Sequence, residues 1–280
     1  MALSILNNIP SLIAENQLNS TQANLQTTLY QLASGSRINS GADDAAGLAI
    51  ADSLQANITA LTQSQQNAND GVGQLQVADG ALSQVTTLLN RAVTLATESA
   101  SGTVSSTQRE ALDAEFSAIK QEIDSIGKDT TFNGTSVFTA STTSIFMSDA
   151  SSTAANNVVG VTMGILSSAS IGTGTPVSLA SDNLTTSAKA TTALSDINSA
   201  IAAIGSVRGA VGASINQLQA ASNIMSTQVQ NLTSAEDNIT AADIASDVAN
   251  MSKYNILEQT GMAALAQANS TEQNVLTLLK

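Results

Sequence analysis

The sequence predicts a mainly α-helical protein, a long antiparallel helical coiled-coil bundle that carries a small β-hairpin insert. Apolar residues recur in alternating steps of three and four over two long stretches of the chain. Hydrophobic residues make up 42% of the sequence but aromatic residues only 2%, a composition that suits close contact between helices. Between residues 131 and 185, Ser, Thr, Val and Gly dominate instead, which favours short strands.

The charge balance excludes two classes of partner. The net charge is −13, and the 9 basic residues are spread thinly over 280 residues. Nucleic-acid binding requires clustered Lys and Arg to neutralise phosphates, and docking on anionic membranes requires the same. No stretch approaches the ~18 continuous apolar residues of a membrane span. We therefore expect neither nucleic-acid binding nor membrane insertion.

The absence of Cys and His excludes most catalytic and metal chemistry. Structural zinc, thiol catalysis and the Ser-His-Asp triad each need one of these residues. A glycosidase that uses only carboxylates remains formally open. We expect no enzyme activity, no cofactor and no metal, because no cleft-forming domain is apparent.

The N-terminal region has the spacing of an amphipathic helix. Leu18, Leu25 and Leu32 are seven residues apart, and residues 34–41 interrupt the pattern as a loop. The first 17 residues lack the basic region and the long apolar core of a secretory signal peptide.

A much longer helix is predicted from about residue 42 to about residue 99, which would span about 85 Å. Gln65 and Asp79 occupy two slots of its otherwise apolar stripe. The apolar members of the stripe are Leu54, Ile58, Leu61, Ala68, Val72, Leu75, Leu82, Val85 and Leu89.

Two adjacent carboxylates, Asp43 and Asp44, lie at the start of this helix. They could hold a metal or exchange protons, or they could stabilise the helix start. A metal site would need further ligands, and the neighbouring sequence supplies none. Ser40 and Asp43 have the spacing of an N-cap and a third helical residue, and carboxylates suit the positive end of a helix. We expect a helix start that Ser40 caps.

A second helix and the insert follow. Thr107 and Glu110 have capping-box spacing, which predicts a helix start near Thr107, and Gly127 is a plausible stop. Asn133-Gly134 predicts a tight hairpin turn. The short strands expected in the insert are TSVF, SIFMS, NNVVGVTM and PVSLA.

The last third of the chain has the cleanest helical periodicity. Ten of twelve seam positions are apolar, which is typical of a coiled coil. Arg208 either lies half-exposed with its head in water, which we favour, or fixes the register of a neighbouring helix. The seam runs through Leu194, Ile197, Ile201, Ile204, Arg208, Val211, Ile215, Leu218, Ser222, Met225, Val229 and Leu232.

A final helix carries Ile244, Val248, Met251 and Leu265 at helical spacing. Both ends of the chain are therefore amphipathic. Such ends pair with each other, with copies of the same chain, or with both, and the residues leave this choice open.

Motif blocks at opposite ends of the chain resemble those of bacterial flagellins. QLASGSRINSGADDAAGLAIADSLQANI and QNANDGVGQLQVADGAL are similar to the family's N-terminal region, and DIASDVANMSKYNILEQTGMAALAQANSTEQNVLTLLK to its C-terminal region. TTFNGTSVF is similar to the point at which the family's helices give way to hairpins. The resemblance covers residues 1–140 and 186–280.

The resemblance implies a domain organisation. Residues 1–41 and 236–280 would form a terminal coiled coil that lines the inner tube of a filament. Residues 42–130 and 186–235 would form a long-helix bundle around it, with residues 131–185 as a variable β-rich insert packed on the bundle. The self-assembly seam would contain Leu18, Leu25, Leu32, Ile244, Val248, Met251 and Leu265.

By the same resemblance, the expected function is that of a structural subunit that self-assembles into the flagellar filament for swimming. The expected partners are copies of the chain, the flagellar export machinery with its chaperone, and the filament cap and hook-junction proteins. The location would be the extracellular flagellum, reached without a cleaved signal peptide. A hook–filament junction protein of the same fold is the alternative.

The resemblance also implies a candidate contact with a vertebrate Toll-like receptor. Arg91 and Leu95 on the long helix, and Glu115 on the next, keep the residue types of recognised flagellins. Val93 and Thr94 depart from them.

Overall fold

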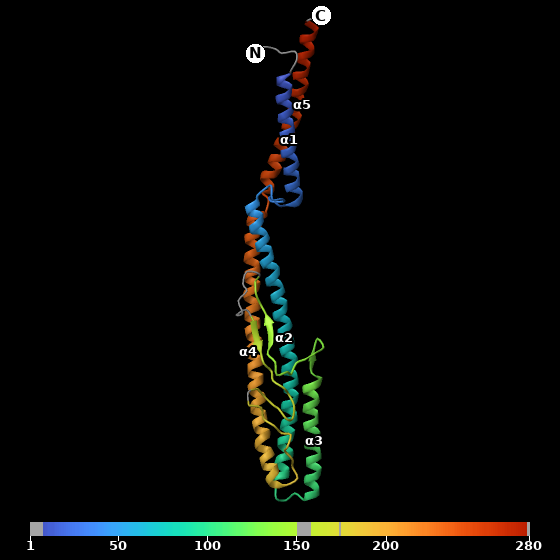
Figure 1. The fold of residues 1–280 in the computed structure, drawn as a ribbon, viewed down its shortest axis with the longest axis vertical. Coiled ribbons are helices and arrows are strands. Elements are labelled where there is room, and N and C mark those ends of the chain that lie inside the picture. The colour runs from blue at the N-terminus through green and yellow to red at the C-terminus, as the bar shows by residue number, and fades with distance from the viewer. Residues whose placement is uncertain (1–7, 150–157, 174, 279–280) are drawn as a thin grey trace. The chain divides into compact units, whose positions relative to one another are not determined.

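A computed structural model describes residues 8–149, 158–173 and 175–278, with side chains described as far as residue 271 (Figure 1). The mainly helical fold with a small β insert is confirmed. The helices are α1 (Ile9–Ser34), α2 (Ala45–Ala100), α3 (Ser106–Asp129), α4 (Ser187–Thr240) and α5 (Ile244–Leu278). The strands are β1 (Thr131–Phe132), β2 (Thr135–Ser136), β3 (Thr143–Phe146) and β4 (Val158–Val161).

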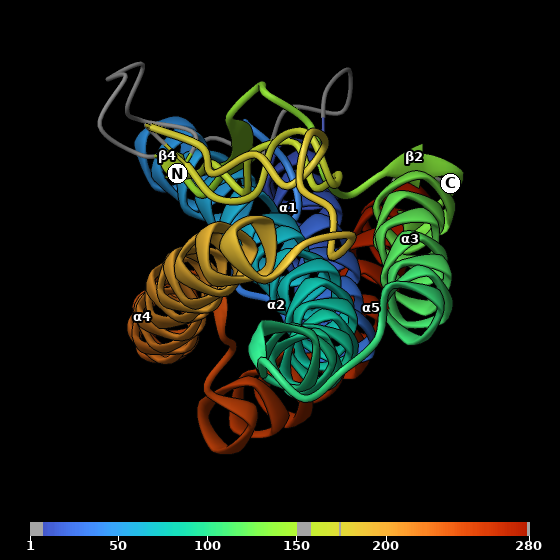
Figure 2. The same ribbon diagram turned by 90° about the horizontal axis from the view of Figure 1, so that it is seen from below.

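The chain divides into two compact units, which we call the terminal unit and the body. The terminal unit comprises Met1–Ala56 and Asn231–Lys280, and the body comprises Asn57–Gln230. In the body, α2 lies between α3 and α4, and the strands and loops of the insert cover one side of this row (Figure 2).

The core of the body follows the predicted helical stripes. On α2 the buried side chains include Leu61, Leu75, Leu82, Val85 and Leu89, each no more than 3% exposed. On α4 the seam positions from Leu194 to Val229 alternate between half-buried and buried, the pattern of a coiled-coil face. The buried members are Ile197, Ile204, Val211, Leu218 and Met225.

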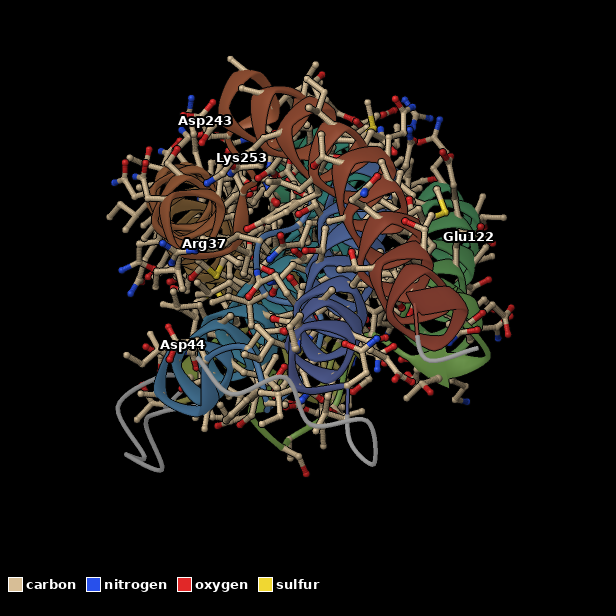
Figure 3. All side chains as sticks on the ribbon, turned by 90° about the horizontal axis from the view of Figure 1, so that it is seen from above. Arg37, Asp44, Glu122, Asp243 and Lys253 are labelled. Carbon is tan, nitrogen blue, oxygen red and sulfur yellow. The ribbon has the colours of Figure 1, made fainter. Side chains whose placement is uncertain are left out.

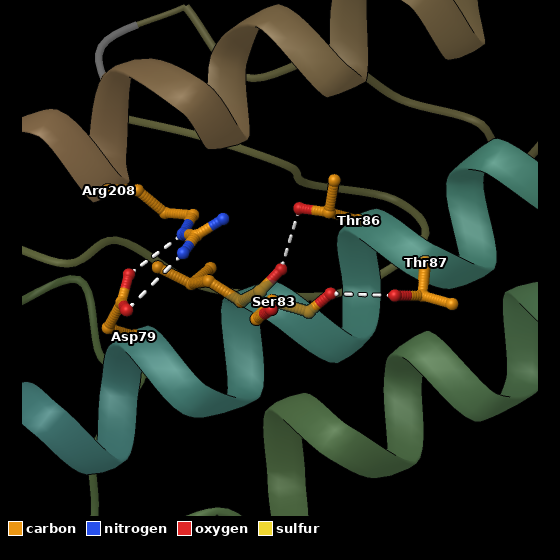
Figure 4. A network of polar contacts seen from close by, with 6 residues as sticks. Asp79, Ser83, Thr86, Thr87 and Arg208 are labelled. Carbon is orange, nitrogen blue, oxygen red and sulfur yellow. Dashed lines mark hydrogen bonds and ion pairs between the residues drawn. The ribbon is translucent and has the colours of Figure 1, made fainter.

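Arg208 meets Asp79 across the α2–α4 interface, so two polar slots in two apolar stripes face each other (Figure 4). The Nε–Oδ1 distance is 2.7 Å and the Nη2–Oδ2 distance is 3.3 Å. Hydrogen bonding to the Asp79 carboxylate raises the pKa of Arg208. The Arg208 side chain is 37% exposed, which agrees with the half-exposed position that we favoured. Its guanidinium pairs with Asp79, however, and this contact between α2 and α4 supports the alternative in which Arg208 fixes the register of a neighbouring helix.

The insert contains two antiparallel strand pairs. The turn at Asn133-Gly134 is confirmed, with φ of 49° and 75°, values that favour Asn and Gly. β3 pairs with β4, from Thr143 opposite Val161 to Phe146 opposite Val158. The predicted strand PVSLA is wrong, because Val177 makes only an isolated bridge with Ile171. The start of NNVVGVTM lies outside the described residues.

Side chains of α2 hold β3 and the residues after it. The Ser64 hydroxyl donates to the carbonyl of Ser148 at 2.8 Å, and the backbone N–H of Ser148 donates back at 3.0 Å. Gly71 leaves room for the Ile145 side chain, which a Cβ at that position would strike.

Side chains of α3 hold the second half of the insert. Asp113 accepts from the N–H of Leu184 at 2.7 Å, and Asp124 accepts from the N–H of Ser168 at 2.6 Å. The prediction that Gly127 ends α3 is wrong. Gly127 lies inside the helix, and the Leu166 carbonyl packs against it.

The helix starts differ in detail from the predictions. Asp44, not Ser40, caps α2, since its Oδ1 accepts from the N–H groups of Ala46 at 3.1 Å and Gly47 at 2.9 Å. Asp43 instead accepts from the loop that precedes the helix. The N–H of Asn39, followed by the hydroxyl and N–H of Ser40, holds the pKa of Asp43 below its usual value.

The capping box of α3 lies two residues before the predicted one. Ser105 accepts from the N–H of Gln108, whose side chain accepts from the N–H of Ser105 at 2.9 Å. α3 begins at Ser106, so the predicted start near Thr107 is confirmed, whereas the predicted capping pair of Thr107 and Glu110 is wrong.

Asp44→Ala should reduce the free energy of unfolding by about 0.5–2 kcal/mol, because two N–H groups lose their capping partner. Urea unfolding followed by circular dichroism measures the effect. Asp52→Ala removes an exposed carboxylate from the interior of the same helix and should cost less. Equal losses for the two variants would contradict the cap.

Candidate assembly surface

α1 and α5 lie side by side in the terminal unit and run antiparallel (Figure 1). The Asn8 amide donates to the Ala268 carbonyl at 3.2 Å, and the Gln22 amide donates to Glu258 at 3.1 Å. Residue numbers thus rise along α1 as they fall along α5. The predicted pairing of the two ends as a coiled coil is confirmed.

The face of α1 within this pair alternates between apolar and hydroxyl residues. Leu18, Leu25 and Leu32 are half-buried, and between them Thr21 and Thr28 are only 3% and 6% exposed. Each threonine hydroxyl donates to a carbonyl of its own helix, at 2.8 and 3.0 Å. Sequence reasoning missed both threonines, although each lies three residues after a seam leucine, at coiled-coil spacing.

The candidate seam residues of α5 fall into two groups. Met251 and Leu265 are half-buried. Ile244 and Val248 are 50% and 41% exposed, so pairing with α1 does not cover them. The structure thus brings the first two into the terminal unit and leaves the other two on its surface.

Both helices carry large apolar side chains that stay exposed in the single chain, and we call a set of seven of them the apolar flank. Exposed apolar side chains that other copies of the chain cover would form an interaction site. The flank comprises Ile9, Leu12, Ile13, Ile244, Val248, Ile256 and Met262, which are 41% to 64% exposed; Leu29 and Tyr30 of α1 are exposed to a similar degree.

Charged side chains are sparse on this pair of helices. Glu15 is the one charged residue in the 26 residues of α1. Up to residue 271, α5 adds Asp247, Lys253 and Glu258 (Lys253 is labelled in Figure 3). Copies of the chain could therefore approach through these helices with little repulsion between like charges.

The three residues predicted to contact a Toll-like receptor differ in their exposure to solvent. Arg91 and Glu115 form an exposed ion pair between α2 and α3, with bonds of 2.7 and 3.1 Å. Hydrogen bonding within the pair raises the pKa of Arg91 and lowers that of Glu115. Leu95 is 1% exposed and packs in the core of the body.

The described residues contain no group of three or more His, Cys, Asp or Glu that could hold a metal ion. None of the helices over those same residues is both long and apolar enough to cross a membrane.

The fold and the paired ends define the class of protein: a helical subunit whose two chain ends form one unit and whose middle forms another. Residues 5–143 match the model of the bacterial flagellin N-terminal helical region. Residues 194–279 match that of the bacterial flagellin C-terminal helical region. The chain belongs to the bacterial flagellin family, a family of structural proteins.

Individual relatives agree with this assignment. Flagellin of Salmonella muenchen is 44% identical over 137 residues, which are 49% of this chain and 27% of that protein. Flagellin A of Vibrio anguillarum is 40% identical over 134 residues, 48% of this chain and 35% of that protein. The chain thus spans only a minor part of the length of these relatives.

Among solved structures, the crystal structure of Bacillus cereus flagellin is 30% identical in sequence. It covers 61% of this chain and 94% of its own, with a TM-score of 0.48.

Proposed function

We propose that this chain is a structural subunit that self-assembles into the helical flagellar filament. Family membership supports the proposal, and the apolar flank of the α1–α5 pair is the observation that carries it. Its seven large apolar side chains are 41% to 64% exposed on two helices that carry few charges. Burial of such surface between copies of the chain would drive assembly.

The proposal gives each region of the chain a role. Residues 1–41 and 236–280 would line the inner tube, residues 42–130 and 186–235 would form the layer around it, and residues 131–185 would pack on that layer. Leu18, Leu25, Leu32, Met251 and Leu265 would hold the two ends together, whereas Ile244 and Val248 would face other copies.

Family membership also supports the remaining partners. We propose export to the extracellular flagellum through the flagellar export machinery, with an export chaperone and without a cleaved signal peptide. The filament cap and the hook-junction proteins would contact the assembled subunits. The alternative, a hook–filament junction protein, is not favoured, because both matching family models are those of flagellin.

Electron microscopy of the purified protein under assembly conditions tests the proposal. Long tubes are expected of a filament subunit. A junction protein would give none, and that result would contradict the proposal.

We further propose that a vertebrate Toll-like receptor recognises the exposed surface around Arg91 and Glu115. Leu95 would act there indirectly, because it is buried and packs α2, the helix that carries both Leu95 and Arg91, into the core of the body. Arg91→Ala should raise the monomer concentration needed to activate receptor reporter cells by about tenfold, the effect of losing one important contact.

Lys189→Ala, which removes an exposed cation from α4, is the matched control and should change nothing. Unmodified monomer that stays silent at high dose would contradict receptor recognition. If Arg91→Ala activates the reporter cells at the same concentration as the unmodified monomer, Arg91 is not part of the receptor contact.

A further inference from the structure

The two linkers of the terminal unit are far apart in sequence but pair with each other. One linker joins α1 to α2 and the other joins α4 to α5. The N–H of Ala242 donates to the carbonyl of Gly35 at 3.1 Å, and Ser36 and Ala241 form an antiparallel bridge. The N–H of Arg37 donates to the carbonyl of Thr240 at 2.7 Å.

The Arg37 side chain continues this pairing onto the end of α4. Its Nη2 donates to the carbonyl of Ile239 at 2.8 Å. The last four carbonyls of a helix have no partner inside the helix. Arg37 therefore satisfies two of them, one through its backbone and one through its guanidinium.

α4 lacks the charge that suits its own C-terminal end. Its last turn contains no basic residue, whereas Glu236 and Asp237 lie just there. Cations are favoured at the negative end of the helix dipole and anions are not. Arg37, brought in by the other linker, supplies the missing cation.

Hydrogen bonds on both sides of Arg37 fix the conformation of the linker that carries it. The Gln31 amide donates to the Arg37 carbonyl at 2.8 Å. The Asp43 carboxylate accepts from the N–H groups of Asn39 and Ser40 at 3.1 and 2.9 Å. Ile38, the residue after Arg37, is 5% exposed and so anchors this linker. Arg37 itself is exposed, so it does not act by filling a core.

We propose that Arg37 is a positioning residue that caps the C-terminal end of α4 and holds the two linkers together. Both ends of the chain would then become ordered in one step. In a chain with only one end ordered, the C-terminal carbonyls of α4 would lack the hydrogen bonds from Arg37. This inference rests on the proposed function, because ordered ends are what copies of the chain would recognise during assembly.

The body contains a matched control. α2 also lacks a basic residue in its last turn. Arg109 of α3 supplies one, since its Nε donates to the carbonyl of Ser99 at 2.7 Å and its Nη2 to that of Ser101 at 2.6 Å. Arg37→Gln and Arg109→Gln thus remove the same charge from the same kind of cap in different units.

The test compares these two variants as full chains. Arg37→Gln should raise the protein concentration at which filaments form by about tenfold, the factor expected from losing one charge-assisted hydrogen bond. It should also speed hydrogen exchange in peptides that cover residues 35–43 and 239–243. Arg109→Gln should leave the assembly concentration within about twofold and lower the thermal midpoint of the body instead.

Asn238→Lys provides a rescue, since it places a cation in the exposed last turn of α4. Added to Arg37→Gln, it should restore most of the lost assembly, which a general structural defect would not allow. If unmodified protein forms no filaments, the proposed function fails. If unmodified protein assembles and Arg37→Gln matches it in concentration and exchange, the role of Arg37 is wrong.

Discussion

Ile244→Asp together with Val248→Asp is expected to abolish filament assembly while leaving the thermal midpoint of the body within about 2 °C of its normal value. Both side chains are exposed in the single chain, at 50% and 41%, and both belong to the terminal unit, so the change leaves the packing of the body intact. Between copies of the chain, each carboxylate would be buried without a partner, which costs several kcal/mol. Sedimentation of the polymer and circular dichroism of the monomer measure the two effects.

The matched control is Ser246→Asp with Ala249→Asp, which adds the same charge to exposed positions in the same turns of α5. This variant removes no large apolar side chain and should still assemble. Filaments of the Ile244/Val248 variant at the normal protein concentration would contradict the assignment of the apolar flank. Loss of assembly in both variants would attribute the effect to charge and would equally contradict it.

Phe116→Ala should lower the free energy of unfolding of the body by about 3–5 kcal/mol. Phe116 is one of only four phenylalanines in the chain, and it is fully buried on α3. Its ring also lies 5.0 Å from the Lys120 ammonium, a contact that alanine cannot make. In a core made largely of small aliphatic residues, no neighbour can fill a cavity of this size.

Urea unfolding of the monomer measures the change. Phe146→Ala is the matched control, since that ring is 54% exposed and its loss should cost less than about 1 kcal/mol. Similar losses for the two variants would contradict the burial of Phe116 in the core of the body.

The long helices could be predicted because their periodicity is sustained over many turns. In α4, Ile197, Ile204, Val211, Leu218 and Met225 are all buried, as the spacing indicates. A single polar slot does not disturb such a pattern. That Asp79 meets Arg208 follows only when both helices are in place, although two polar slots in two apolar stripes were a signal that could have been used.

Helix ends were harder to predict, because neighbouring residues carry the same capping chemistry. Ser40 and Asp44 can each cap a helix, and only the path of the loop selects Asp44. At α3, Ser105 with Gln108 and Thr107 with Glu110 have the same spacing, so sequence alone cannot separate them.

The assembly surface was predicted in part, and the missing part has a physical reason. Apolar spacing marks a residue for burial but does not say which surface buries it. Leu18 and Leu25 are half-buried in the single chain, whereas Ile244 and Val248 are exposed. Thr21 and Thr28 were missed because their hydroxyls look polar in sequence, yet each donates to its own helix and can be buried.

The most direct test of the central claim is electron microscopy of two purified chains under identical assembly conditions: the full chain, and one that ends at residue 235. The second keeps the body but lacks the partner of α1. We predict long helical tubes from the full chain and none from the shortened one. Absence of tubes from the full chain, or tubes from the chain without residues 236–280, would contradict the claim that the paired ends carry assembly.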